Sequence, residues 1–157
     1  MAISEKDKAM IMRLQDNLST IRNLGGWSIR EFADLCNVSP QTVSNWESKN
    51  SSNTINLGNY WQIVATLGAE MAKRGDSDIF TKLVTYILSG DDNEKQYEEN
   101  TKKIATLGQT SKGGASSEVL NALAPALGLA ALPMVPRGVV IGGAIGYLFS
   151  QFLSDKK

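Results

Sequence analysis

Uncharged polar side chains of the kind that can read base edges are concentrated between Ser39 and Ser48. Glutamine and asparagine can each form two hydrogen bonds to adenine, whereas serine and threonine pair with more than one base. Residues three and four positions apart share one face of a helix, which places Gln41, Ser44 and Asn45 together. If this segment is helical, the pattern indicates a hydrogen-bonding surface for the major groove of DNA.

Local signals predict the two helices that would position this surface. Ser28 and Glu31 have the spacing of a capping box at the start of one short helix. Ser39 followed by Pro40 is a strong start for a second helix. The connection, residues 37–39, begins with an asparagine, which tolerates the left-handed backbone that a tight turn needs. Together these signals predict a helix-turn-helix, whose second helix can lie in the major groove.

Apolar periodicity extends the helical prediction on both sides of this motif. Apolar residues three and four apart predict one amphipathic helix over residues 10–24, ended by two glycines. A fourth helix is predicted over residues 57–67, ending at Gly68, and a short fifth helix over residues 69–73. No window alternates with a period of two for long enough to indicate a sheet. The expected fold is therefore all-α.

The stretch from Ile21 to Gly68 resembles the Cro/cI-type repressor family, also called the Xre family of bacterial and phage regulators, over about a third of the chain. The matching residues are Arg22, Ser28, Phe32-Ala33, Val38-Ser39, Thr42-Val43-Ser44, Trp46-Glu47 and Leu67-Gly68. The resemblance implies a five-helix DNA-binding domain at residues 1–74 that regulates transcription, as repressors of this family do. Its expected partner is double-stranded operator DNA.

The resemblance also implies roles for individual residues. The residues expected to contact DNA are Ser39, Gln41, Thr42, Ser44, Asn45, Lys49 and Asn50. Among them, Gln41, Ser44 and Asn45 would contact bases, and the others would lie near phosphates. An ion pair between Arg22 and Glu47 is expected to fix the angle of the second helix and to present the guanidinium near a phosphate.

Two departures from the family pattern predict modest DNA affinity for a single copy. Ile29 stands where the family usually has a glutamine that braces the recognition helix, and Pro40 stands where a base-reading residue is common. Residues 1–74 also carry a net charge of only about +1, so few cations neutralise phosphates. We therefore expect a homodimer or a higher oligomer on DNA.

Composition argues against several classes of activity. The chain has no histidine, which removes the commonest general base and a common metal ligand. The single cysteine, Cys36, excludes a disulfide framework or a multi-cysteine zinc site within one chain. We therefore expect neither an enzyme, nor a cofactor, nor a metal site. Residues 1–8 are polar and no apolar region follows, so the chain is expected in the cytoplasm.

The composition changes after the expected DNA-binding domain. Residues 75–90 predict an additional helix that begins after Ser77 and ends at Gly90. Residues 91–118 are polar and poor in apolar side chains, which predicts a partly helical linker able to act as a tether.

Residues 119–157 form an apolar segment rich in glycine and alanine, in which Arg137 is the only charge before residue 155. Two prolines near Arg137 predict a break between two short helices, and therefore a helical hairpin. Gly138, Gly142 and Gly146 would share one helix face and permit close backbone approach.

Three alternatives remain open for this segment. It could be a membrane hairpin that attaches the protein to the inner face of the membrane through residues 119–153. It could instead be an oligomerisation module, or it could pack on the helical domain as extra core. A second functional hypothesis is that this segment is a membrane-active glycine zipper. In that case the N-terminal helix-turn-helix would serve as a control module or a protein-docking module.

Overall fold

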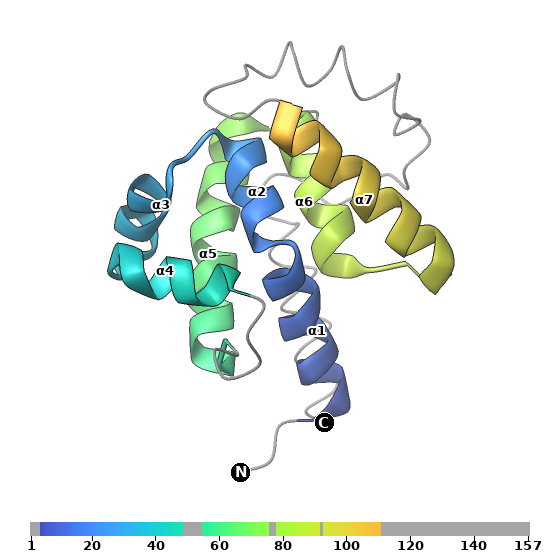
Figure 1. Cartoon of the computed structure of the whole chain (residues 1–157), viewed down its shortest axis with the longest axis horizontal. Coiled ribbons are helices and arrows are strands. Elements are labelled where there is room, and N and C mark those ends of the chain that lie inside the picture. Colours follow the sequence, from blue (N-terminus) through green and yellow to red (C-terminus); the bar gives the residue numbers. More distant parts are fainter. Residues whose placement is uncertain (1–3, 49–54, 76–77, 92, 111–157) are drawn as a thin grey trace.

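Helices account for all the regular structure in the part of the chain that the computed structural model describes, which is residues 4–48, 55–75, 78–91 and 93–110 (Figure 1). The helices are α1 (Glu5–Asp16), α2 (Leu18–Gly25), α3 (Ile29–Cys36), α4 (Pro40–Glu47), α5 (Leu57–Arg74), α6 (Ile79–Ser89) and α7 (Glu94–Thr110). The predicted all-α class is confirmed for these residues. The expected C-terminal hairpin, with Gly138, Gly142 and Gly146, lies outside them.

Where the sequence predicts one N-terminal helix, the structure has two. The helical geometry is interrupted at Asn17, whose φ and ψ are −112° and 10°, and whose side-chain amide donates a hydrogen bond of 2.8 Å to the carbonyl of Arg13. A side chain that bonds to the preceding turn competes with the helical backbone. The break lets α1 pack against α5 and α6 while α2 packs against α7.

The predicted fourth and fifth helices are one continuous helix, α5. The apolar stripe that includes Leu67 continues to Met71, and both side chains are buried. Because this stripe is unbroken, packing carries the helix through Gly68, which is itself buried, despite the weak helix propensity of glycine. The helix ends at Gly75, where φ is 98°.

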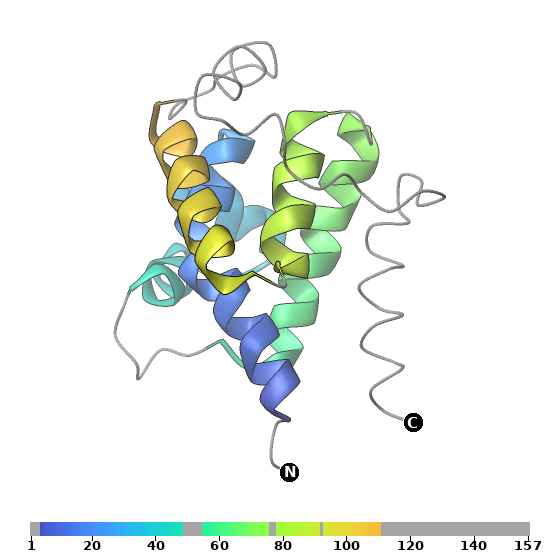
Figure 2. The same ribbon diagram turned by 90° about the vertical axis from the view of Figure 1, so that its right-hand side faces the viewer.

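The helices α6 and α7 pack on the helices that precede them in the chain. The helix α6 ends at Gly90 as predicted, but its N-cap is Asp78 and not Ser77: the Asp78 carboxylate accepts a hydrogen bond from the amide of Phe80. The helix α7 lies along α2 (Figure 2). Residues 94–110 are therefore a packed helix within the stretch 91–118 that was predicted to be a partly helical linker, and residues 111–118 lie outside the described residues. Their few apolar side chains gather on one face, where Ile104 and Leu107 are fully buried.

Polar contacts fix α7 to α6. The Tyr86 hydroxyl donates a hydrogen bond of 2.8 Å to the Asp91 carboxylate and accepts one of 3.0 Å from the side-chain amide of Asn100. The Tyr97 hydroxyl donates a hydrogen bond of 2.7 Å to the carbonyl of Ile87. A buried polar residue that is hydrogen-bonded in this way specifies one docking geometry.

One buried and one half-buried tyrosine, Tyr60 and Tyr97, make the stability of this core sensitive to alkaline pH. Burial raises the pKa of Tyr60 from 10.0 to about 12, and it does the same for Tyr97. The unfolded chain loses these protons above pH 10, whereas the folded chain retains them up to about pH 12. The free energy of unfolding should therefore fall as the pH rises through this interval.

We expect Tyr60→Phe to weaken this pH dependence without loss of stability at pH 7. The Tyr60 hydroxyl is buried and has no hydrogen-bond partner among the described residues, so its removal is neutral or stabilising by up to about 1 kcal/mol. Tyr97→Phe should also weaken the pH dependence, but it should cost about 1 kcal/mol because it loses the bond to Ile87. Urea unfolding at pH 7 and pH 11 measures both effects. Equal losses in the two variants at pH 7 would contradict this interpretation.

Candidate nucleic-acid interface

The predicted helix-turn-helix is present at α3 and α4. At the start of α3, the Ser28 hydroxyl accepts a hydrogen bond from the Glu31 amide, and the Glu31 carboxylate accepts one from the Ser28 amide, so the capping box is complete. Asn37 has φ 59° and ψ 45°, the left-handed conformation expected at the turn. The Val38 amide then donates a hydrogen bond to the Ala33 carbonyl. These contacts fix the angle between the two helices.

The second helix, α4, buries one face and exposes the other. Val43 and Trp46 are buried in the core. On the opposite face Gln41, Ser44 and Asn45 are exposed, with Thr42 half-buried beside them. We call the exposed residues Gln41, Ser44 and Asn45 the polar face of α4. It carries no charge, because the one charged residue of α4 is Glu47.

Two members of the polar face are already joined. The side-chain nitrogen of Gln41 donates a hydrogen bond of 3.0 Å to the side-chain oxygen of Asn45. This bond orients both amides and leaves Gln41 Oε1 as an acceptor and Asn45 Nδ2 as a donor. One acceptor and one donor side by side are what the major-groove edge of adenine requires.

The N-terminus of α4 holds the residues expected near phosphates. The Ser39 hydroxyl accepts a hydrogen bond of 3.1 Å from the Thr42 amide, and the two hydroxyl oxygens lie 2.8 Å apart. Ser39 therefore caps α4 while it remains exposed at the start of the helix. The other two expected phosphate contacts, Lys49 and Asn50, lie outside the described residues.

The structure brings Arg22 and Glu47 together as a two-pronged ion pair. Arg22 Nε donates to Glu47 Oε2 at 2.6 Å, and Nη2 donates to Oε1 at 3.0 Å. Nη1 donates to the carbonyl of Trp27 at 3.0 Å, and the side chains of the pair are each 12 % exposed. One guanidinium thus joins α2, the following turn and the end of α4. With so little of it exposed, the guanidinium acts as a brace for α4, and its contact with a phosphate stays a prediction.

Sequence reasoning missed a second brace, Gln15 of α1. Its side-chain nitrogen donates a hydrogen bond of 3.1 Å to the carbonyl of Trp46, and its side-chain oxygen accepts one of 3.0 Å from the amide of Ile55. Gln15 thus connects the end of α4 to the segment that precedes α5. Ile29, at the position where the family has its bracing glutamine, is half-buried against the core. The only sequence signal for Gln15 was its place beside the apolar stripe of the first helix.

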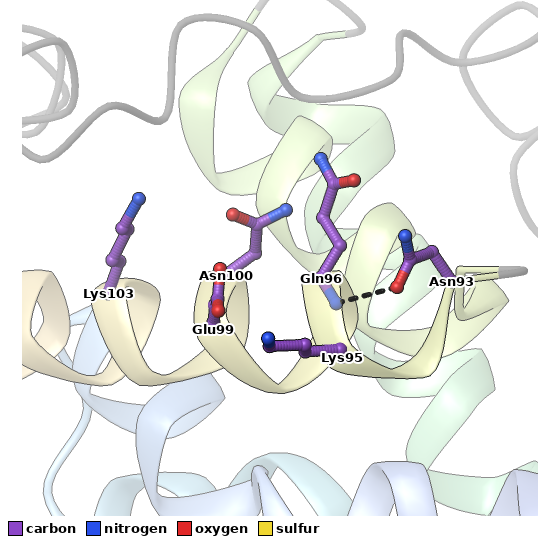
Figure 3. A pocket seen from close by; sticks show the side chains of 6 residues that line it. All are labelled: Asn93, Lys95, Gln96, Glu99, Asn100 and Lys103. Carbon is purple, nitrogen blue, oxygen red and sulfur yellow. Dashed lines mark hydrogen bonds between the residues drawn. The ribbon is translucent and has the colours of Figure 1, made fainter.

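Another polar surface of the molecule lies along α7. Figure 3 shows the side chains of this helix and of Asn93 that line an open pocket. The Asn93 side-chain oxygen caps the helix by accepting a hydrogen bond from the Gln96 amide. The other lining residues include Lys95, Glu99 and Lys103. Ligand pockets are usually lined mainly by apolar side chains, whereas the residues that line this pocket are all polar or charged. Across the described ranges, no helix is long and apolar enough to cross a membrane.

A capped pair of short helices, joined by a left-handed turn and exposing a polar face, defines a helix-turn-helix domain. Residues 18–73 match the family model described as helix-turn-helix, and this part of the chain is accordingly a helix-turn-helix domain of the Cro/Xre type, as the sequence predicted. The family is one of DNA-binding transcription regulators, which are usually not enzymes. Searches of curated proteins and of solved structures find no match to the chain.

Proposed function

We propose that this protein is a sequence-specific transcription regulator of bacterial or phage type, which reads operator DNA through the polar face of α4. The observation that carries the proposal is the combination of an anchored helix with an exposed, uncharged amide pair, Gln41 and Asn45. Short polar side chains on a firmly held helix can discriminate base edges, because their positions are fixed before DNA arrives.

In this proposal the roles are divided along α4. Gln41 and Asn45 contact an adenine, and Ser44, on the same face, contacts a neighbouring base. Ser39 and Thr42 at the start of the helix approach the phosphate backbone, as do Lys49 and Asn50 after it. Arg22, Glu47 and Gln15 hold α4 at the angle that this docking requires.

The regulator is proposed to act in the cytoplasm as a homodimer or higher oligomer, and as a repressor that blocks its operator. Eight basic and seven acidic side chains in residues 1–74 leave little charge to attract phosphates. Binding by two copies to two half-sites would add the base contacts of both, with half-sites about one helical turn of DNA apart.

The test is a selection of duplexes from a random pool by the full-length protein, followed by fluorescence anisotropy on the selected duplex. The double substitution Gln41→Ala, Asn45→Ala should weaken binding to that duplex by about tenfold to a hundredfold. Binding to an unrelated duplex should change little, because phosphate contacts remain.

Gln96→Ala is the matched control, because it removes an exposed amide from α7 on another surface. It should leave both affinities unchanged. If the double variant keeps the affinity and the sequence preference of the wild type, α4 is not the reading helix.

A further inference from the structure

The side chain of Gln62 reaches from α5 to the end of α3. Its amide nitrogen donates a hydrogen bond to the carbonyl of Cys36, the last residue of α3. The two residues are 26 positions apart in the chain, and α5 packs against α3 (Figure 1). The contact therefore fixes the end of α3 to a helix that lies outside the helix-turn-helix.

The carbonyl of Cys36 is one that needs a donor from elsewhere. The last four carbonyls of an α-helix have no donor within the helix. The amides of the turn residues Asn37 and Val38 donate to earlier carbonyls of α3, at Asp34 and Ala33. The Gln62 amide supplies a donor at the last residue before the turn.

A second side chain of α5 approaches the same residue. Thr66 lies one helical turn after Gln62, and its hydroxyl is within hydrogen-bonding reach of the buried Cys36 thiol. The same hydroxyl donates a hydrogen bond of 2.9 Å to the carbonyl of Gln62. One face of α5 thus contacts both the backbone and the side chain of Cys36.

The turn that is held in this way leads directly into α4. Two residues separate Cys36 from Ser39, the N-cap of α4, and Gln41 lies in the first turn of that helix. A displacement of the end of α3 would therefore move the Gln41 amide, because the backbone between them is short and hydrogen-bonded. Arg22 and Gln15 hold α4 at its other end.

We propose that Gln62 is a positioning residue, which sets the base preference of α4 by fixing the start of that helix. This inference rests on the proposed function, in which the polar face of α4 reads bases. Without an anchor at its start, α4 would pivot about its C-terminal end and carry Gln41 away from its base. A recognition group must stay within about 0.5 Å of its working position to discriminate between partners.

The test compares the affinity of the full-length protein for the duplex that it selects from a random pool with its affinity for single-base-pair variants of that duplex. Gln62→Met keeps the length of the side chain, removes its donor and adds no charge. The ratio of the two affinities should fall by about fivefold at the base pair where Gln41→Ala also loses preference, which is the effect of about one hydrogen bond. Binding to an unrelated duplex should change little, because phosphate contacts carry no sequence information.

Two matched variants separate positioning from other effects. Gln62→Lys restores a donor and should retain the wild-type ratio, although its charge strengthens binding to every duplex. Gln96→Met makes the same change as Gln62→Met at an exposed glutamine of α7, and it should leave the ratio unchanged. If Gln62→Met keeps the base preference of the wild type, Gln62 does not position α4.

Amide hydrogen exchange measured by NMR tests the same anchor without DNA. In Gln62→Met the amides of Asn37 and Val38 should exchange about fivefold faster, whereas exchange in α6 should not change. Unchanged exchange at the turn would contradict the anchoring. A wild-type protein that selects no preferred duplex would overturn the proposed function instead, and the exchange measurement would still decide whether Gln62 holds the turn.

Discussion

Arg22→Ala is expected to abolish measurable operator binding and to lower the free energy of unfolding by about 3 kcal/mol. The substitution leaves the Glu47 carboxylate largely buried without its partner, and it also removes the donor to the Trp27 carbonyl. The end of α4 would then be free to rotate, and the polar face would lose its orientation. Thermal unfolding by circular dichroism should show a decrease of roughly 10 °C in Tm.

Two further variants separate the brace from general charge effects. Arg30→Ala removes an exposed arginine from α3 and should change stability by less than about 0.5 kcal/mol. The double substitution Arg22→Met, Glu47→Leu should recover most of the lost stability, because no unpaired charge remains in the buried site. If Arg22→Ala were as stable as the wild type, the ion pair would not hold α4 in solution.

The double substitution Ile104→Ala, Leu107→Ala is expected to cause the largest loss of stability. Both side chains are fully buried where α7 lies on α2, and each truncation should cost about 2–5 kcal/mol. Either α7 detaches or the whole helical domain unfolds at a lower temperature. Urea unfolding followed by far-ultraviolet circular dichroism, with native-state hydrogen exchange of α7, distinguishes these outcomes.

The matched control for this prediction is Glu99→Ala with Lys103→Ala, which removes two exposed side chains of the same helix. It should change stability by less than about 0.5 kcal/mol for each substitution. A tether would tolerate both pairs of substitutions equally. Equal behaviour of the two double variants would therefore show that α7 does not pack on α2 in solution.

Local signals were sufficient to predict the helix-turn-helix. The capping box at Ser28, the left-handed Asn37 and the Ser39-Pro40 start each specify a backbone conformation within a few residues. Such signals depend on neighbouring backbone groups, and distant contacts do not override them here. The exposure of the α4 amides could be predicted in the same way, because a helix that buries one face in the core leaves its opposite face exposed.

The features that sequence reasoning missed depend on contacts between distant segments. The break at Asn17 allows α1 and α2 to pack against different helices, and apolar periodicity alone does not reveal these different neighbours. The helix α7 has few apolar residues, and its packing becomes evident only once α2 presents a surface to Ile104 and Leu107. Gln15 binds backbone groups of residues 46 and 55, and no local pattern signals a partner so far along the chain.

The absence of charge on the polar face of α4 has a consequence for how the regulator would behave in the cell. Contacts made by amides and hydroxyls displace few condensed counterions, so occupancy of the target would vary only weakly with potassium concentration. The same property would reduce retention on bulk chromosomal DNA, where attraction is almost wholly ionic. Osmotic stress would therefore change the occupancy of the DNA target less for this regulator than for one that binds the duplex mainly through lysines.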